Sequence, residues 1–238
     1  MRRARVLAGA LLALALPVGA HTAPAPASLD FVPPAAGTYP LPPIQVAPQG
    51  DVLDTAGRRR SLSEFTRGRI TLLGLIYTRC ADPEGCPRST WAFSEVRALL
   101  REDPALQART RLVSVSFDPV HDRPRVLGAY AARSGGSRRG ADWHFLTAPS
   151  PRALAPILDG FGQDLRVAAE SRAVPGTEEF THSLKVFLID PAGRVREIYS
   201  TAYLMPLMIL NDIRTLDGER PYSYSATGTQ EQKRLRSP

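Results

Sequence analysis

One stretch, residues 70–90, constrains the fold of this chain more than any other. It opens with an apolar run, Ile70–Tyr77, whose length and composition are typical of a buried strand. The only two cysteines of the chain, Cys80 and Cys86, follow directly. Pro87 comes next, and proline is favoured in the first turn of a helix. The sequence therefore predicts that both thiols lie on a loop that leaves a strand and enters a helix.

This position has chemical consequences for the two thiols. Unpaired backbone N–H groups and the helix dipole stabilise negative charge at a helix start, so a thiolate is favoured there over a thiol. A thiolate attacks disulfides and binds soft metal ions. The five-residue spacer between the cysteines also allows them to close a small disulfide. The residues alone leave open a structural disulfide, a redox-active pair and a metal site.

The remaining periodicity predicts one α/β domain with a thioredoxin-like fold, in which helices flank a central mixed sheet. A capping box of Ser61 and Glu64 predicts a brief helix, and residues 162–180 are expected to form an inserted loop. The longer helices are expected at 87–102, 123–133, 151–161 and 203–216, and the later strands at 111–118, 143–147, 182–190 and 195–200.

The N-terminus is typical of a secretory signal. Three arginines within the first five residues precede Val6–Ala20, a 15-residue apolar stretch that ends in small residues. We expect cleavage after Ala20; the alternative is an uncleaved anchor, although a membrane span usually needs about 20 residues. The predicted organisation is a signal at 1–20, a Pro/Ala-rich linker at 21–49, the domain at 50–217 and a polar tail at 218–238. Such a chain is expected in the periplasm.

The charge of the chain does not favour a nucleic-acid partner. The formal net charge is +7, and removal of the three arginines of the signal leaves +4. The short basic runs, such as Arg58–Arg60, carry no interleaved aromatic residues. Membrane contact is expected only through an uncleaved signal.

A third donor for a metal site is offered by one of the four histidines. His182 opens the predicted strand 182–190, and in a thioredoxin-like sheet the start of this late strand lies beside the thiol loop. Two thiolates and one imidazole suit monovalent copper, a soft ion that accepts three ligands. Zinc would also accept them but usually takes a fourth donor. His121 and His144 have no partner cluster and are assigned to loops or packing.

The order of several motifs resembles the Sco/SenC family of copper-binding thioredoxin-fold proteins. The matching pieces lie between residues 51 and 216, and they are an Asp-x-x-Gly start with SLSEF, GLIYTRC followed by CP, SFDPVHDRPRVLGAYA, WHFLT, and THSLKVFLID with a glycine turn. The resemblance implies a copper metallochaperone that assists assembly of the copper centre of cytochrome c oxidase, with subunit II as a receiving partner and a thiol-disulfide reductant as another.

Carried over residue by residue, the resemblance implies Cys80, Cys86 and His182 as copper ligands. Asp118 and Asp122 match acidic positions of the family, although a strand-end turn and a helix cap are the more ordinary roles for them. The family usually has three residues between its cysteines, whereas this chain has five. The longer spacer places carboxylates beside the sulfurs, which raises a thiol pKa and opposes the effect of the helix start. A second departure is Thr181, which stands where an acidic residue often precedes the histidine.

Other functions use the same residues differently. A thiol-disulfide oxidoreductase, which would keep the cysteines of a copper-enzyme subunit reduced, needs only Cys80 and Cys86 as its catalytic pair. A peroxidase of the peroxiredoxin type shares the fold but is matched only around Thr78–Cys80. A domain that senses copper without delivering it would carry the same ligands.

Overall fold

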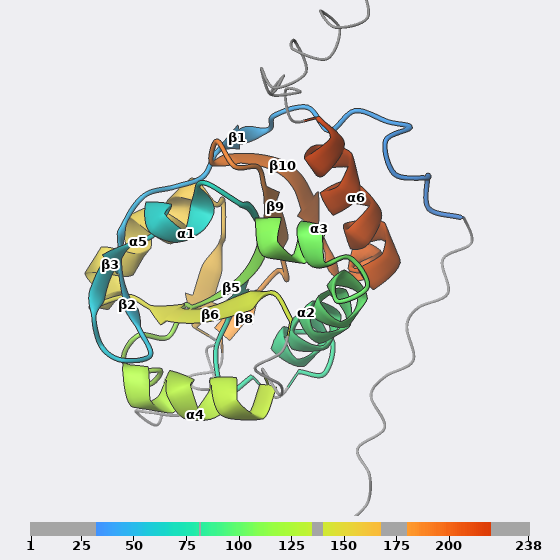
Figure 1. Ribbon diagram of the computed structural model, residues 1–238. Coiled ribbons are helices and arrows are strands. Elements are labelled where there is room, and N and C mark those ends of the chain that lie inside the picture. Colours follow the sequence, from blue (N-terminus) through green and yellow to red (C-terminus); the bar gives the residue numbers. More distant parts are fainter. Residues whose placement is uncertain (1–31, 81, 135–139, 168–179, 220–238) are drawn as a thin grey trace, which may run out of the picture.

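A central mixed sheet organises the protein (Figure 1). The computed structural model describes residues 32–80, 82–134, 140–167 and 180–219, with the backbone alone in 165–167 and 180–182. Within this part of the chain the sheet has the order β1 (Gln45–Val46), β10 (Arg194–Tyr199), β9 (Val186–Ile189), β4 (Ile70–Ile76), β5 (Thr110–Ser116), β6 (Asp142–Thr147), β2 (Asp51–Asp54), β3 (Arg59–Ser61). Strands β4, β5 and β6 run parallel, and the other neighbours are antiparallel. The predicted mixed sheet is therefore confirmed.

Helices cover both faces of the sheet and enclose two apolar cores. In the view of Figure 1, α2, α3 and α6 lie on one side, α1 and α5 on the other, and α4 across the lower end. Their bounds are α1 (Ser63–Thr66), α2 (Cys86–Leu100), α3 (Pro104–Arg109), α4 (Pro124–Ser134), α5 (Pro151–Gly160) and α6 (Pro206–Gly218). Leu72 of β4 shares a core with Phe93 and Ile213, whereas its neighbour Leu73 shares the other core with Ile157. Because successive side chains of a strand point to opposite faces, a strand covered on both faces must be mainly apolar, and all of β4 is buried, with Thr71 its one polar side chain.

The helix after the thiols begins one residue earlier than the sequence predicted. α2 starts at Cys86, with Pro87 in its first turn. This places the sulfur of Cys86 inside the first turn of the helix rather than on the loop. The capping box is also present in part, since Ser61 N donates a hydrogen bond to the Glu64 carboxylate over 2.8 Å.

Two elements differ from the prediction. α3 was not predicted, although Asp103 caps it by accepting a hydrogen bond from Leu106 N over 2.9 Å and Pro104 opens it. The prediction of a single strand at 182–190 was wrong. His182 is the last residue of β8 (Phe180–His182), and β9 is a separate strand that follows it. β8 pairs with β7 (Leu165–Val167) in a separate two-stranded sheet, whereas β9 lies in the central sheet. Hydrophobic pattern does not reveal such a change of pairing partner.

Residues 34–46 form an N-terminal strap along α6 and the edge of the central sheet. Pro34 O accepts a hydrogen bond from Asn211 Nδ2 over 2.8 Å, and Gly37 N donates to Thr215 Oγ1 over 2.9 Å. The strap ends in β1, which pairs with the beginning of β10. Part of the predicted linker 21–49 thus packs on the domain.

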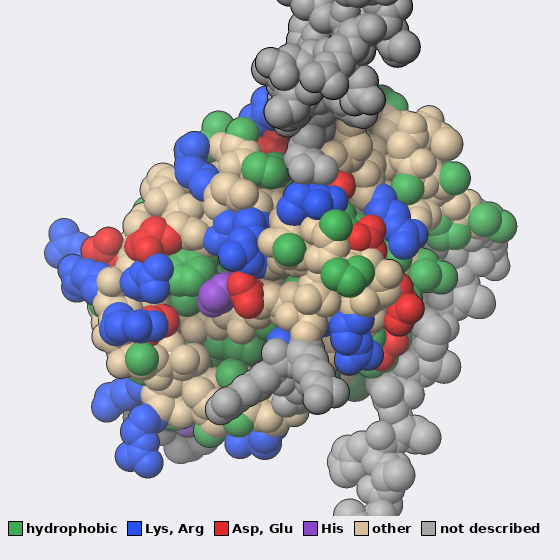
Figure 2. Space-filling view, in the orientation of Figure 1, with side chains coloured by type: hydrophobic (Ala, Val, Ile, Leu, Met, Phe, Trp, Pro, Cys, Tyr) green, Lys and Arg blue, Asp and Glu red, His purple; other side chains and the backbone are tan. Residues whose placement is uncertain are grey.

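The two ends of the chain complete the outline. The predicted signal at 1–20 and the tail from residue 220 lie outside the described residues. Among the helices that are described, none has both the length and the apolar character needed to cross a membrane. Figure 2 shows basic and acidic side chains interspersed over one face of the molecule.

Candidate metal centre

The two cysteines lie where β4 gives way to α2, as predicted. Both are free thiols, Cys86 fully buried and Cys80 partly exposed. Tyr77 N, just beyond the end of β4, donates a hydrogen bond to Cys86 Sγ over 3.4 Å. The strand end and the helix start thus hold Cys86 from two sides, while Cys80 faces a cavity.

The spacer between the cysteines folds back on itself. Gly85 N donates to Asp82 O over 3.1 Å, and Glu84 N donates to the Asp82 carboxylate over 3.0 Å. A Cβ atom on Gly85 would lie 3.1 Å from Cys80 Sγ, which is closer than such contacts normally come. Glycine at this position therefore lets the turn bring Cys80 close to the first turn of α2 despite the longer spacer.

The two thiols differ in acidity. The pKa of Cys80 is lowered to about 6, chiefly because the Cys86 thiol donates a hydrogen bond to the Cys80 sulfur, with a further contribution from the backbone N–H of Cys86. The same contact, together with burial, raises the pKa of Cys86. The carboxylate of Glu84 is paired with Arg88 over 2.9 Å, which offsets its charge. At neutral pH Cys80 is therefore the thiolate and Cys86 the thiol.

Two aspartates from the end of β5 hold the segment that leads into Cys80. The buried carboxylate of Asp122 accepts hydrogen bonds from Thr78 N over 2.9 Å, from Thr78 Oγ1 and from Ser116 Oγ over 2.6 Å. Asp118 forms an ion pair with Arg79 over 2.8 Å. Asp118 also shapes the turn after β5, as predicted, whereas the carboxylate of Asp122 binds Thr78 and Ser116 rather than serving as the predicted helix cap. Both residues immediately before Cys80 are thus fixed by carboxylates.

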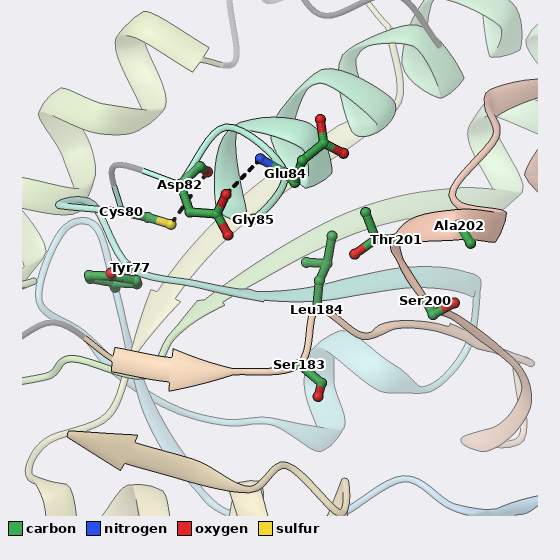
Figure 3. Close-up of a pocket in the computed structure, with 10 residues that line it drawn as sticks. All are labelled: Tyr77, Cys80, Asp82, Glu84, Gly85, Ser183, Leu184, Ser200, Thr201 and Ala202. Carbon is green, nitrogen blue, oxygen red and sulfur yellow. Dashed lines mark hydrogen bonds between the residues drawn. The ribbon is translucent and has the colours of Figure 1, made fainter. Parts of the chain in front are cut away.

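A groove opens onto Cys80 and leads to the backbone that follows His182 (Figure 3). Cys80 and Tyr77 lie at one end of it, and the chain just beyond β8 contributes Ser183 and Leu184. His182 is the last residue of β8, in register with Leu165 of β7, and its backbone alone is described. The strand that carries His182 therefore runs toward the cavity that holds the exposed thiol.

The approach to β7 is tied to the same place by Gln163. Its Nε2 donates a hydrogen bond to Ser183 O over 3.1 Å, and the side chain is buried. This contact joins the residue that follows His182 to the segment that precedes β7. It fixes the backbone on which the predicted third ligand stands.

A second hollow of about 390 Å³ reaches both sulfurs from the side of α4. Its walls include Trp91 of α2 and Tyr130 of α4, whose hydroxyl lies 3.0 Å from Thr90 Oγ1. Trp91 also packs against the core beneath α2. Cys86 lines this hollow and not the groove of Figure 3.

The other described histidines lie in loops or packing, as predicted. His144 on β6 is half-buried and meets the Phe65 ring edge-on, with ring centroids 5.1 Å apart, and burial lowers its pKa. His121 lies exposed in the turn after β5. Among the side chains that the structure describes, no three Cys, His, Asp or Glu residues gather into a metal-binding group. The side chain of His182, the predicted third ligand, lies outside the described part of the chain.

Several residues of the site were missed by the sequence reasoning. Thr78 and Ser116 were not singled out, because their contacts with Asp122 join residues 44 and 6 positions apart. A signal for them existed: β4 and β5 are adjacent parallel strands, so polar residues at their carboxyl ends must meet. The wall Ser200–Ala202 of the groove carried no such signal.

The fold and the paired thiols together define a thioredoxin-like protein with a strand–thiol–helix site. The sequence model of the SCO1/SenC family matches residues 43–216, most of the chain. The chain belongs to the SCO1/SenC family.

Similar proteins agree with this assignment. The SCO1 protein homolog of Bacillus subtilis (strain 168) is 26% identical over 161 residues, covering 67% of this chain and 76% of the relative. The solution structures of apo Sco1 from Thermus thermophilus match with a TM-score of 0.62 at 26% identity, over 77% of this chain and 98% of that one.

Two further solved structures share the fold at lower identity. Copper-bound ScoI of Arabidopsis thaliana matches with a TM-score of 0.60 at 15% identity, over 73% of this chain and 99% of that one. BsSco, a member of the Sco family of cytochrome c oxidase assembly proteins with a disulfide switch, matches with a TM-score of 0.58 at 23% identity, over 75% of this chain and 98% of that one.

Proposed function

We propose that this protein is a copper metallochaperone that binds Cu(I) through Cys80, Cys86 and His182. It delivers the ion during assembly of the copper centre of cytochrome c oxidase. The observation that carries the proposal is the pair of unoxidised thiols at the start of α2, one of them beside the groove to which the His182 strand leads.

The donor set fits copper as cargo. Two sulfurs and an imidazole are soft or intermediate donors, and three such ligands satisfy monovalent copper. Cys86 must lose its proton to coordinate, and its raised pKa makes capture dependent on displacement of that proton by the metal. Copper bound to the related ScoI of Arabidopsis thaliana supports the choice of ion.

Release of the cargo follows from the same chemistry. Ligand exchange passes the ion to cysteine or histidine side chains of a receiving protein, for which subunit II of cytochrome c oxidase is our candidate. Oxidation of Cys80 and Cys86 to a disulfide removes both thiolate ligands, so a thiol-disulfide reductant must restore the pair before the next copper is bound.

The experiment is an anaerobic Cu(I) titration of the reduced full chain, with bound metal measured after desalting. We expect one copper per chain, lost in Cys80→Ser and Cys86→Ser and much weakened in His182→Ala. The matched control is His121→Ala, which removes an exposed imidazole and should bind copper as the wild type does. Full copper retention in either cysteine variant would remove the assignment.

A second function is favoured by one observation, the difference in acidity between the two thiols. A half-exposed thiolate with a pKa of about 6 beside a buried thiol is the arrangement of a nucleophile with its resolving partner. A thiol-disulfide oxidoreductase would attack the disulfide of a copper-enzyme subunit through Cys80 and be released by Cys86. Its activity should survive His182→Ala, whereas copper binding should not, and this variant separates the two functions.

The site of action is proposed from the N-terminal signal. We place the protein in the periplasm, with the signal cleaved after Ala20 or retained as an anchor. Intact-mass measurement of the protein recovered from periplasmic and membrane fractions tests this. A mass that begins at His21 in the periplasmic fraction indicates cleavage, and a full-length mass in the membrane fraction indicates an anchor.

A further inference from the structure

The groove on Cys80 is larger than a metal ion requires. Its volume is about 630 Å³. Pockets that hold organic ligands or short chain segments usually enclose about 300–1,000 Å³. The groove therefore has room for part of another molecule in addition to the ion.

The two walls of the groove differ in chemistry. One wall is the spacer between the cysteines, with Asp82 and Glu84 (Figure 3). The other is the turn Ser200–Ala202 between β10 and α6, which adds the hydroxyls of Ser200 and Thr201. Hydroxyl groups both donate and accept hydrogen bonds, so this wall suits the peptide groups of an extended chain.

Two exposed apolar side chains follow the second wall in the sequence. Tyr203, 52% exposed, follows directly on Ser200–Ala202, and Leu207, 60% exposed, stands four residues further on in the first turn of α6. Tyrosine is enriched at protein–protein interfaces, and an exposed leucine adds apolar area that a partner can cover. The other exposed large apolar side chains of the described residues are Val32, Ile44 and Val46, in or before the N-terminal strap, and Val120 in the turn after β5.

The first wall carries one carboxylate without a counter-ion. Glu84 is paired with Arg88, but among the described residues no basic side chain forms an ion pair with Asp82, whose carboxylate accepts only the N–H of Glu84. A lysine or arginine of an incoming segment would meet this charge close to Cys80. The extra length of the spacer thus adds an acidic contact next to the ligand that exchanges copper.

We propose that this groove docks an extended segment of the copper-receiving protein, with a basic side chain against Asp82 and an apolar side chain against Tyr203 and Leu207. The proposal rests on the proposed copper delivery and specifies how the partner is recognised. Ligand exchange requires the acceptor's own cysteine or histidine within bonding distance of Cys80, and the groove leads a segment to that point.

The test measures docking without copper. The reduced, copper-free full chain is titrated with the apo soluble copper domain of cytochrome c oxidase subunit II by calorimetry. Leu207→Asp should raise the dissociation constant by about tenfold or more, because a charge replaces an apolar contact beside the groove. Val46→Asp is the matched control, because Val46 is also exposed, at 64%, but lies on β1. β1 pairs with the beginning of β10, whereas the wall of the groove follows the end of β10.

A second variant tests the acidic contact. Asp82→Asn keeps an oxygen that can accept the Glu84 N–H but removes the charge. It should weaken docking at low ionic strength, and the difference from the wild type should shrink as salt is added.

The outcomes separate this proposal from the proposed function. Equal dissociation constants for Leu207→Asp and Val46→Asp, or no docking by the wild type, would overturn the docking groove even if the chain binds copper. Loss of Cu(I) binding by the wild type would overturn copper delivery, whereas selective weakening by Leu207→Asp would still support the groove as a docking surface.

Discussion

Removal of the Asp122 carboxylate tests how strongly the thiol segment is held. This side chain is fully buried and accepts three hydrogen bonds, two from Thr78 and one from Ser116. A hydrogen bond to a charged group contributes about 1.5–3 kcal/mol, and each buried donor left without an acceptor costs about 1–3 kcal/mol. Because the effects overlap, we expect Asp122→Ala to lower the free energy of unfolding by about 3–5 kcal/mol.

The assay is urea unfolding of the reduced, metal-free chain at pH 7, followed by circular dichroism. Asp122→Asn retains one carbonyl oxygen as an acceptor and should lose less, about 2 kcal/mol. Alkylation of Cys80 reports the local effect, because release of Thr78 loosens the segment that positions this sulfur. Both variants should therefore change the alkylation rate in the native state.

Asp142→Ala supplies the matched control. Asp142 is also an aspartate in an ion pair, with Arg69 over 2.8 Å, but its side chain is 57% exposed. Exposed ion pairs contribute about 1 kcal/mol or less. If Asp122→Ala were as stable as Asp142→Ala, the carboxylate would not anchor the thiol loop and the reasoning would be refuted.

Three further predictions concern the same end of the molecule and α6. The alkylation rate of Cys80 in the reduced, metal-free chain should rise with pH, and the midpoint of this rise should lie near the pKa of about 6. Cys86→Ala should move the midpoint upward because the thiol that donates to Cys80 is lost. An unchanged midpoint would contradict the assigned contact. Gly85→Ala should displace the spacer, since the added Cβ would lie 3.1 Å from Cys80 Sγ, and weaken Cu(I) binding about tenfold or more in a competition assay with a chromophoric chelator. Burial raises the pKa of Asp212, which accepts hydrogen bonds from two tyrosine hydroxyls, so its contribution to stability is present in acid and lost as pH rises through the folded-state pKa. The stability of the wild type relative to Asp212→Asn should therefore increase as the pH falls from the raised folded-state pKa toward the ordinary value of 3.8, and urea unfolding between pH 7 and pH 4 measures this. A pH-independent difference would exclude this coupling.

The main elements of the fold could be predicted because the way each one is buried leaves a recognisable pattern in the sequence. β4 is covered on both faces and reads as a mainly apolar run, whereas β5, equally buried, was recognised by its alternating, β-branched pattern. Pro87 marked the beginning of α2 to within one residue. α3 carried an equally clear signal in Asp103 and Pro104, which was not used.

Other features depend on contacts between distant segments, which periodicity does not contain. The division of residues 180–189 between two sheets follows from the pairing of β8 with β7. The packing of the N-terminal strap depends on partners such as Thr215, 178 positions further along the chain.

The position of the two thiols could be predicted from the sequence, but the contacts that hold them in place could not. Cys80 and Cys86 are the only cysteines, so their position between strand and helix could be assigned directly. The effect of the spacer on the pKa of Cys80 could not be predicted. It depends on the contact between the two sulfurs and on the pairing of Glu84 with Arg88, which the sequence does not show. The side chain of His182 lies outside the described part of the chain, and its role stays a prediction.

The N-terminal strap joins the domain at a distance from the groove along α6. The strap meets α6 near Asn211 and Thr215 and the sheet at the beginning of β10, whereas the groove is lined by the turn after the end of β10 and before the start of α6. A pull on the chain from its N-terminal side would thus load the strap, the far half of α6 and the sheet edge, and leave the thiol loop without tension.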